Sequence, residues 1–260
     1  MNAVPPVTPN EPLAEANRAV VSIAVLVAVL AFAAVLSAER SFVALGLQLL
    51  AVEFMGGKLA VPWTSAYRPV ASSRDIAEYM GRGAALGAGM AAVAGLVSAV
   101  AGTPVEVARW VGWGALVAVL ELALAAARDE VLLRGMLRRG FGSLVSRPVF
   151  SLFAALASAA WMFGLGEAHP FVLVREAALA LVAVELWRLD DGAFPAIGFQ
   201  VAFRFVEAAF GGTRAVTSVL VVETLVLAMG AAWLACREDP ADIAEARDHS
   251  AATRGRGLLN

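Results

Sequence analysis

The sequence predicts an all-α fold, a polytopic membrane protein of about eight transmembrane helices. Of its 260 residues, 60% are hydrophobic and only 16% are charged, whereas a soluble domain carries about 25% charged and about 45–50% apolar residues. The mean hydropathy is +0.75, and the apolar residues come in long runs. This composition excludes a soluble enzyme and a disordered chain. The net charge of −2 leaves no basic footprint for nucleic acid, so no nucleic-acid partner is expected.

Apolar runs that can cross a hydrocarbon core of about 30 Å follow one another along most of the chain. The expected spans are Ala19–Leu36, Phe42–Val61, Gly83–Ala101, Trp110–Ala127, Pro148–Leu165, Phe171–Trp187, Phe194–Phe210 and Ala215–Ala235. The second span is the weakest, because Glu53 and Lys58 interrupt it. We expect one transmembrane domain over residues 19–236, between a polar N-terminal segment (1–18) and a polar C-terminal tail (237–260).

Basic residues between the spans predict the orientation, since cytoplasmic loops are enriched in Lys and Arg. Three arginine groups fall on the same side if all the spans cross: Arg68, Arg74 and Arg82; Arg138, Arg139 and Arg147; Arg237, Arg247, Arg254 and Arg256. Both termini are then expected in the cytoplasm, with the chain in a bacterial inner membrane. The N-terminal segment lacks the positive region and cleavage site of a secretory signal, so the first span is expected to be retained.

Two residue types predict where helices pack together and which residues lie at the membrane surface. Small residues favour the close approach of helices, and glycines recur in the third span at Gly83, Gly87, Gly89 and Gly95. Tryptophans are enriched at membrane interfaces, and Trp110, Trp113 and Trp187 lie near span ends. We therefore expect the glycines to pack against another helix and the tryptophans to act as interfacial anchors.

Charged residues inside apolar runs are costly, and this makes them functional candidates. The densest group begins Arg128-Asp129-Glu130 and continues to Arg134-Gly135 at the end of the fourth span. No proline interrupts residues 115–139, so one long helix is expected there. On a helix, Glu130 and Arg134 share a face. An ordinary i,i+4 ion pair in a basic cytoplasmic loop would explain this spacing equally well.

The segment Asp129-Glu130-x-x-x-Arg134-Gly135 resembles the first motif, Glu-Glu-x-x-x-Arg, of the CPBP intramembrane endopeptidases. This family of CAAX proteases and bacteriocin-processing enzymes is also called Abi. The resemblance implies about eight helices, here with a family-like core at about residues 110–235. It also implies two downstream motifs, Phe-x-x-x-His and His-x-x-x-Asn or Asp.

The stretch from Trp161 to Pro170 resembles the second of these motifs. The position four residues after Phe163 holds Glu167, and the nearest histidine is His169, two residues later. Either His169 or Glu167 then fills the motif position. A helix end with a proline stop explains the same residues without a functional role.

The expected helix lengths make it difficult for this second motif to lie at the same membrane depth as Glu130. Glu130 lies about 15 Å from the turn near residues 140–143, whereas His169 lies about 30 Å beyond Pro148 at 1.5 Å per residue. The two depths match only if one helix tilts strongly or if the fifth span starts after Pro148.

The stretch Pro195-Ala196-Ile197-Gly198 resembles the start of the helix that carries the third motif. Gln200 stands at the histidine position, and Arg204 stands where Asn or Asp is expected. A structural role would also explain Arg204, because Arg204 and Glu207 are three residues apart and could neutralise each other on one helix.

The resemblance implies hydrolysis of peptide bonds in membrane-anchored or membrane-proximal protein substrates at the bilayer. The expected site comprises Glu130, Asp129, Arg134, His169, Glu167, Gln200 and Arg204. Glu130 would act as the base that activates water, and Arg134 would orient the carboxylates. Gln200 could donate a hydrogen bond to the oxyanion through its amide.

No cofactor is expected, although the family was formerly described as metal-dependent. A catalytic zinc normally has three protein ligands, and the chain has 2 histidines, of which His249 lies in the polar tail. A glutamate-activated water therefore fits better than a metal centre.

Two other functions stay open. Glu167, Gln200 and Arg204 differ from the residues of the second and third family motifs. These differences also fit an inactive family member that serves as a binding, immunity or maturation accessory. Carboxylates within the spans, at Glu121, Glu185 and Glu223, could instead serve ion transport, although the chain lacks the repeated halves of many transporters.

Overall fold

The computed structural model describes most of the chain from residue 73 to residue 237. The described residues are 45–46, 48–50, 73–103, 113–135, 137–138, 145–167, 169–190, 192–209 and 217–237. The first expected span, nearly all of the second, Trp110, the polar N-terminal segment and the C-terminal tail after residue 237 lie outside these residues.

Six of the expected spans coincide with helices, and every described element is helical. The helices are α3 (Ser73–Val100), α4 (Trp113–Glu130), α6 (Arg147–Gly164), α7 (Pro170–Asp190), α8 (Phe194–Ala209) and α9 (Thr217–Ala235). Prolines in the first turns of α6, α7 and α8 explain where these helices begin, since proline needs no N–H partner there. The all-α prediction is confirmed for the described part of the chain.

The helix that carries Glu130 is not continuous, contrary to expectation. Helix α4 ends at Glu130, and the next five residues form a π-helical turn, η2 (Val131–Gly135). Such turns are rare, and they occur mostly as single bulges in α-helices, often at functional sites. The absence of proline could not predict this change, because a π-turn needs no helix-breaking residue.

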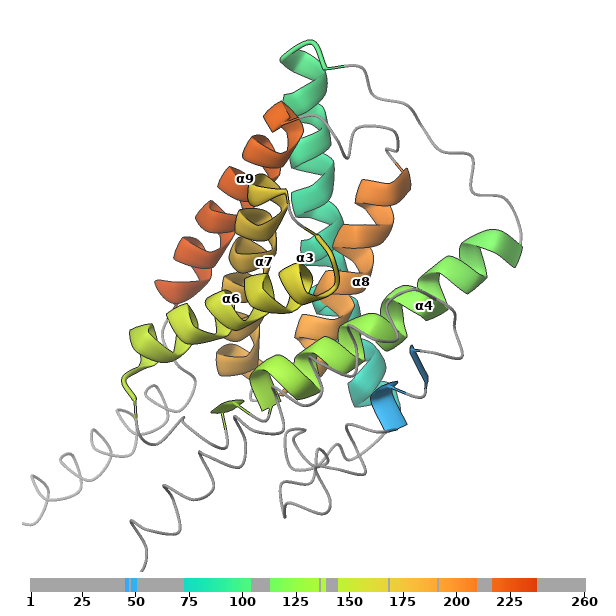
Figure 1. Cartoon of the computed structure of the whole chain (residues 1–260). Coiled ribbons are helices and arrows are strands. Elements are labelled where there is room, and N and C mark those ends of the chain that lie inside the picture. Colours follow the sequence, from blue (N-terminus) through green and yellow to red (C-terminus); the bar gives the residue numbers. More distant parts are fainter. Residues whose placement is uncertain are drawn as a thin grey trace, which may run out of the picture.

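The helices form one bundle around a shared core (Figure 1). Helices α3, α7, α8 and α9 run side by side, while α4 and α6 lie obliquely across them. The most extensive contact joins α3 to α8, and α7 packs against both α6 and α9. This arrangement brings the end of α4 and the turn η2 next to α6, α7 and α8.

Glycines set the close contact between α3 and α8. A Cβ atom at Gly83 would overlap the backbone carbonyl of Pro195, and one at Gly87 would overlap that of Phe199. Gly198 on α8 meets the Met80 carbonyl in the same way. The packing role is thus confirmed for Gly83 and Gly87 but is wrong for Gly89, which has open space around it.

Within the described part of the chain, three helices, α3, α6 and α9, are long and apolar enough to cross a membrane. Their outward faces carry large exposed hydrophobic side chains, among them Leu96, Leu156 and Met229. The interior, by contrast, holds buried charged residues. Apolar residues outside and charged residues inside are the pattern of a helical membrane protein.

Candidate functional site

Glu130 lies at the centre of a buried polar cluster, with 0% of its surface exposed. Arg134 Nη1 donates to Glu130 Oε1 over 2.6 Å, and Gln200 Nε2 donates to the same oxygen. Trp187 Nε1 donates to Glu130 Oε2 over 2.5 Å. The donors come from η2, α8 and α7, so three separate elements converge on one carboxylate.

The neighbouring Asp129 has its own cationic partner. Arg128 lies 2.7 Å from Asp129 Oδ1, donates to Gln48 over 2.5 Å, and lies 4.9 Å from the ring centre of Trp161. The ion pair with Arg128 engages one carboxylate oxygen of Asp129. Both contacts of Arg128 end on Oδ1, and within the described part of the chain the other oxygen, Oδ2, takes part in neither.

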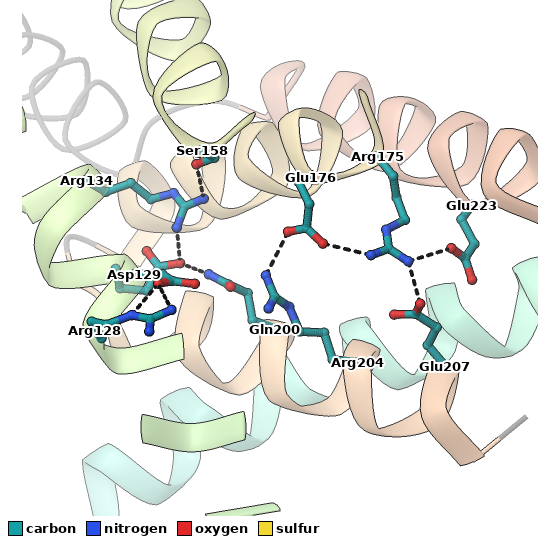
Figure 2. A network of polar contacts seen from close by, with 11 residues as sticks. Arg128, Asp129, Arg134, Ser158, Arg175, Glu176, Gln200, Arg204, Glu207 and Glu223 are labelled. Carbon is teal, nitrogen blue, oxygen red and sulfur yellow. Dashed lines mark hydrogen bonds and ion pairs between the residues drawn. The ribbon is translucent and has the colours of Figure 1, made fainter. Parts of the chain in front are cut away.

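A second cluster continues from α8 towards α9 (Figure 2). Arg204 donates to Glu176 over 2.7 Å, and Glu176 accepts a second bond from Arg175 over 2.9 Å. Arg175 also contacts Glu207 and Glu223, so it lies among three carboxylates. Glu207 thus binds Arg175 on α7, and Arg204 binds Glu176 on the same helix.

The two clusters together are nearly neutral. They contain the carboxylates of Asp129, Glu130, Glu176, Glu207 and Glu223 and the guanidinium groups of Arg128, Arg134, Arg175 and Arg204. Buried charges are tolerated when they are paired and hydrogen-bonded, whereas one left unpaired is strongly destabilising. The pairing explains how so many charged residues fit inside this bundle.

A small cavity lies between the clusters. Asp129, Arg134, Glu176, Gln200 and Arg204 line it, and Ser158 and Trp161 of α6 contribute to its wall. About 10 Å³ is open to the centre of a water molecule, which is roughly the space that one water requires. Trp161 Nε1 and Arg204 Nε are buried and have no hydrogen-bond acceptor among the described residues. The cavity thus offers room for one small acceptor.

The second expected motif lies elsewhere, at the turn from α6 to α7. Gly166, with φ +90°, ends α6 together with bonds from its own N–H to Phe163 and from the Glu167 N–H to Met162. This is a Schellman motif. The exposed His169 donates its backbone N–H to Glu167 over 3.2 Å. The structure therefore brings Asp129, Glu130, Arg134, Gln200 and Arg204 together and leaves Glu167 and His169 at a helix end.

Several residues of the site were not expected from the sequence. The interfacial role expected for Trp187 is wrong, because this residue is 4% exposed and holds Glu130. Glu176, Arg175 and Ser158 also belong to the clusters. The adjacent charges Arg175 and Glu176 inside an apolar run were a signal that could have identified them.

Two other carboxylates within the expected spans, Glu185 and Glu223, form ion pairs with arginines. Glu185 contacts Arg147 and Arg188 at 2.7 and 2.8 Å, and Glu223 contacts Arg175 at 3.3 Å. Within the described ranges, no group of three His, Cys, Asp or Glu side chains is placed to hold a metal ion. The site is therefore one of carboxylates, guanidinium groups and one amide.

Comparison with models of protein families, with characterised proteins and with solved structures found no match to this chain.

Proposed function

We propose that this chain is an intramembrane endopeptidase of the CPBP type, a multi-pass protein of about eight spans with both termini in the cytoplasm of a bacterium. The motif resemblance motivates the family. The observation that carries the proposal is the convergence of Glu130, Arg134 and Gln200 beside a cavity for a single water. Those residues come from two motifs 70 positions apart.

The base that we assign differs from the one expected from the sequence. Glu130 accepts three hydrogen bonds, is fully enclosed and does not line the cavity. Asp129 lines the cavity and has Oδ2 available. A general base must lie within hydrogen-bond reach of the proton that it takes. Asp129 therefore suits the base, and Glu130 suits the role of fixing Gln200 and Arg134 around it.

The reaction then proceeds as follows. The water oxygen attacks the carbonyl carbon of the substrate amide while Asp129 accepts a proton from that water. Arg204 Nε and Trp161 Nε1, two of the buried donors without a partner in the described chain, stabilise the oxyanion. Asp129 returns the proton to the amide nitrogen as the C–N bond breaks. The substrate is a membrane-anchored or membrane-proximal protein segment, and the reaction needs no cofactor.

The test compares membrane proteomes from a strain that lacks the endogenous gene and carries wild type, Asp129→Asn, Glu130→Gln or Arg82→Gln. Arg82→Gln is the control, because Arg82 lies in an exposed ion pair with Glu78 on α3. New peptide termini should appear with wild type and the control and disappear with Asp129→Asn. Identical termini in all four strains would refute the enzyme.

The second candidate is an inactive family member that binds membrane proteins. The placement of Glu167 and His169 at the α6–α7 turn favours it, because no histidine of the described residues then lies in the site. It predicts identical peptide termini in every strain, together with co-purification of a membrane partner that does not depend on Asp129.

A further inference from the structure

A second, larger cavity lies beside Arg134, which also lines the small cavity of the candidate site. Its lining includes Arg147, Phe150, Val184 and Trp187. Its volume is about 250 Å³, and one water needs only about 10–15 Å³, so several waters fit. We name this space the outer cavity and the small cavity of the candidate site the inner cavity.

The outer cavity extends from the surface of the bundle to the residues that hold Glu130. Among its lining residues, the side chain of Arg147 is 48% exposed and Val145 is partly exposed. Arg134 and Trp187 line it as well, and both are buried and donate to Glu130. Water can therefore enter near the start of α6 and reach the donors around Glu130.

The outer and inner cavities follow one another between α6 and α7, which pack together. On α6, Phe150 lines the outer cavity, and Ser158, about 12 Å further along the helix, lines the inner one. On α7, Val184 lines the outer cavity and Leu179 the inner one. Arg134 is the one described residue that lines both, so its side chain separates the two cavities.

The guanidinium group of Arg134 is held firmly at one end only. Nη1 donates to Glu130 over 2.6 Å, whereas Nη2 lies 3.4 Å from Ser158 Oγ (Figure 2). That second distance is beyond the usual range of about 2.7–3.2 Å for such bonds. Nε is buried and has no acceptor among the described residues. The contact with Ser158 is therefore the one that breaks most easily.

We propose that water passes from the outer cavity to the inner one beside the side chain of Arg134, which acts as the gate. When Nη2 leaves Ser158, the guanidinium group turns about its bond to Glu130 and the two cavities join. The inner cavity has room for about one water, so a hydrolysis that consumes it needs another in each turnover. This role rests on the proposed function, whereas the water path itself does not require an enzyme.

The test measures how fast the indole N–H of Trp161 exchanges with deuterated water, by NMR on the full chain in detergent. This N–H is buried without an acceptor in the described chain, and Trp161 lines the inner cavity. Loss of its signal in Trp161→Phe identifies it. A bulky maleimide on Val145→Cys, in a Cys236→Ser background, blocks the outer cavity. The same label on Val149→Cys is the control, because Val149 is 52% exposed and is not among the lining residues.

The block should slow exchange at Trp161 about tenfold or more relative to the control, because exchange of a buried N–H requires access of water. Equal exchange rates in the two labelled proteins would mean that water takes another path, and this would overturn the proposal.

Two serines of α6 test Arg134 as the gate without breaking its ion pair. Ser158→Ala removes the acceptor of Nη2, and one hydrogen bond shifts an equilibrium about two- to tenfold, so exchange at Trp161 should become faster by a factor in that range. Ser151→Ala is the matched control, because the buried hydroxyl of Ser151 has no partner among the described residues; it should leave the rate unchanged.

The two changes are then combined. With the outer cavity blocked, Ser158→Ala should leave exchange slow, because the gate opens onto a closed space. Fast exchange despite the block, or equal rates for Ser158→Ala and Ser151→Ala, overturns the proposal. These rates do not depend on proteolysis, so failure of the gate and failure of the proposed enzyme are distinguishable.

Discussion

Trp187 donates its indole N–H to Oε2 of Glu130 over 2.5 Å, joining the end of α7 to the end of α4 across 57 positions of sequence. Both side chains are buried. The bond engages the carboxylate oxygen that Arg134 and Gln200 do not contact. Trp187 is therefore a positioning residue for the candidate site.

Trp187→Phe should lower stability while keeping most of the apolar contact. The substitution leaves Oε2 of Glu130 without its donor, and an unsatisfied buried acceptor costs about 1–3 kcal/mol. Unfolding in denaturing detergent measures the loss. Trp113→Phe is the control, because Trp113 is 81% exposed; equal midpoints for the two variants would contradict the positioning role.

The pair of Arg204 and Glu176 should behave as a buried ion pair. Arg204→Met leaves a buried carboxylate and should cost about 3–5 kcal/mol, whereas replacing both partners by apolar residues should recover much of that loss. A double-mutant cycle with Glu176→Leu measures the coupling free energy between the two side chains. Additive effects of the two single changes would mean that these residues do not interact in the folded protein.

The close approach of α3 to α8 makes two glycines behave differently. Gly87→Ala places a methyl group against the Phe199 carbonyl, and such overpacking costs about 1–3 kcal/mol. Gly89→Ala meets no atom within 4 Å and should be neutral or stabilising by up to about 1 kcal/mol, because alanine favours helix. Thermal unfolding of both variants distinguishes a packed helix pair from a loose one.

The outward apolar side chains should face lipid. Spin labels at Leu96→Cys and Leu156→Cys, in a Cys236→Ser background, should collide more often with oxygen than with a water-soluble nickel complex. These positions are 65% and 59% exposed in the bundle. A label at the exposed Glu78 of α3 serves as the comparison. Preferential collision with nickel at Leu96 and Leu156 would be incompatible with membrane-spanning α3 and α6.

His169→Ala should change neither processing nor stability. The residue is exposed at the start of α7, where substitutions are usually within about 0.5 kcal/mol. Quantified peptide termini and unfolding midpoints should match wild type. Loss of processing with normal stability would assign His169 to the site and favour the second motif as expected from the sequence.

The sequence predicted the helices well because apolar runs and prolines are local signals. Pro148, Pro170 and Pro195 lie in the first turns of α6, α7 and α8, so the starts of these helices could be read directly. The first-motif pair of Glu130 and Arg134 could also be predicted, since their spacing is fixed within one helical segment.

The partners across helices could not be predicted in this way. Arg204 pairs with Glu176 on α7, and this depends on how α7 and α8 pack rather than on spacing within α8. Trp187 was misplaced for a related reason, because its position near a span end is shared by interfacial and buried tryptophans alike. It is buried because the end of α7 meets the end of α4 at Glu130 in the folded bundle.

The wider turn at Val131–Gly135 gives this region a particular sensitivity to chain length. A π-turn accommodates more backbone than an α-turn, so removing one residue there would restore ordinary winding. The helix beyond the turn would keep about the same rotation relative to α4. Arg134, however, would follow Glu130 by three positions instead of the four that their ion pair now spans. Loss of a single codon between them would therefore move the cation relative to its carboxylate without altering either side chain.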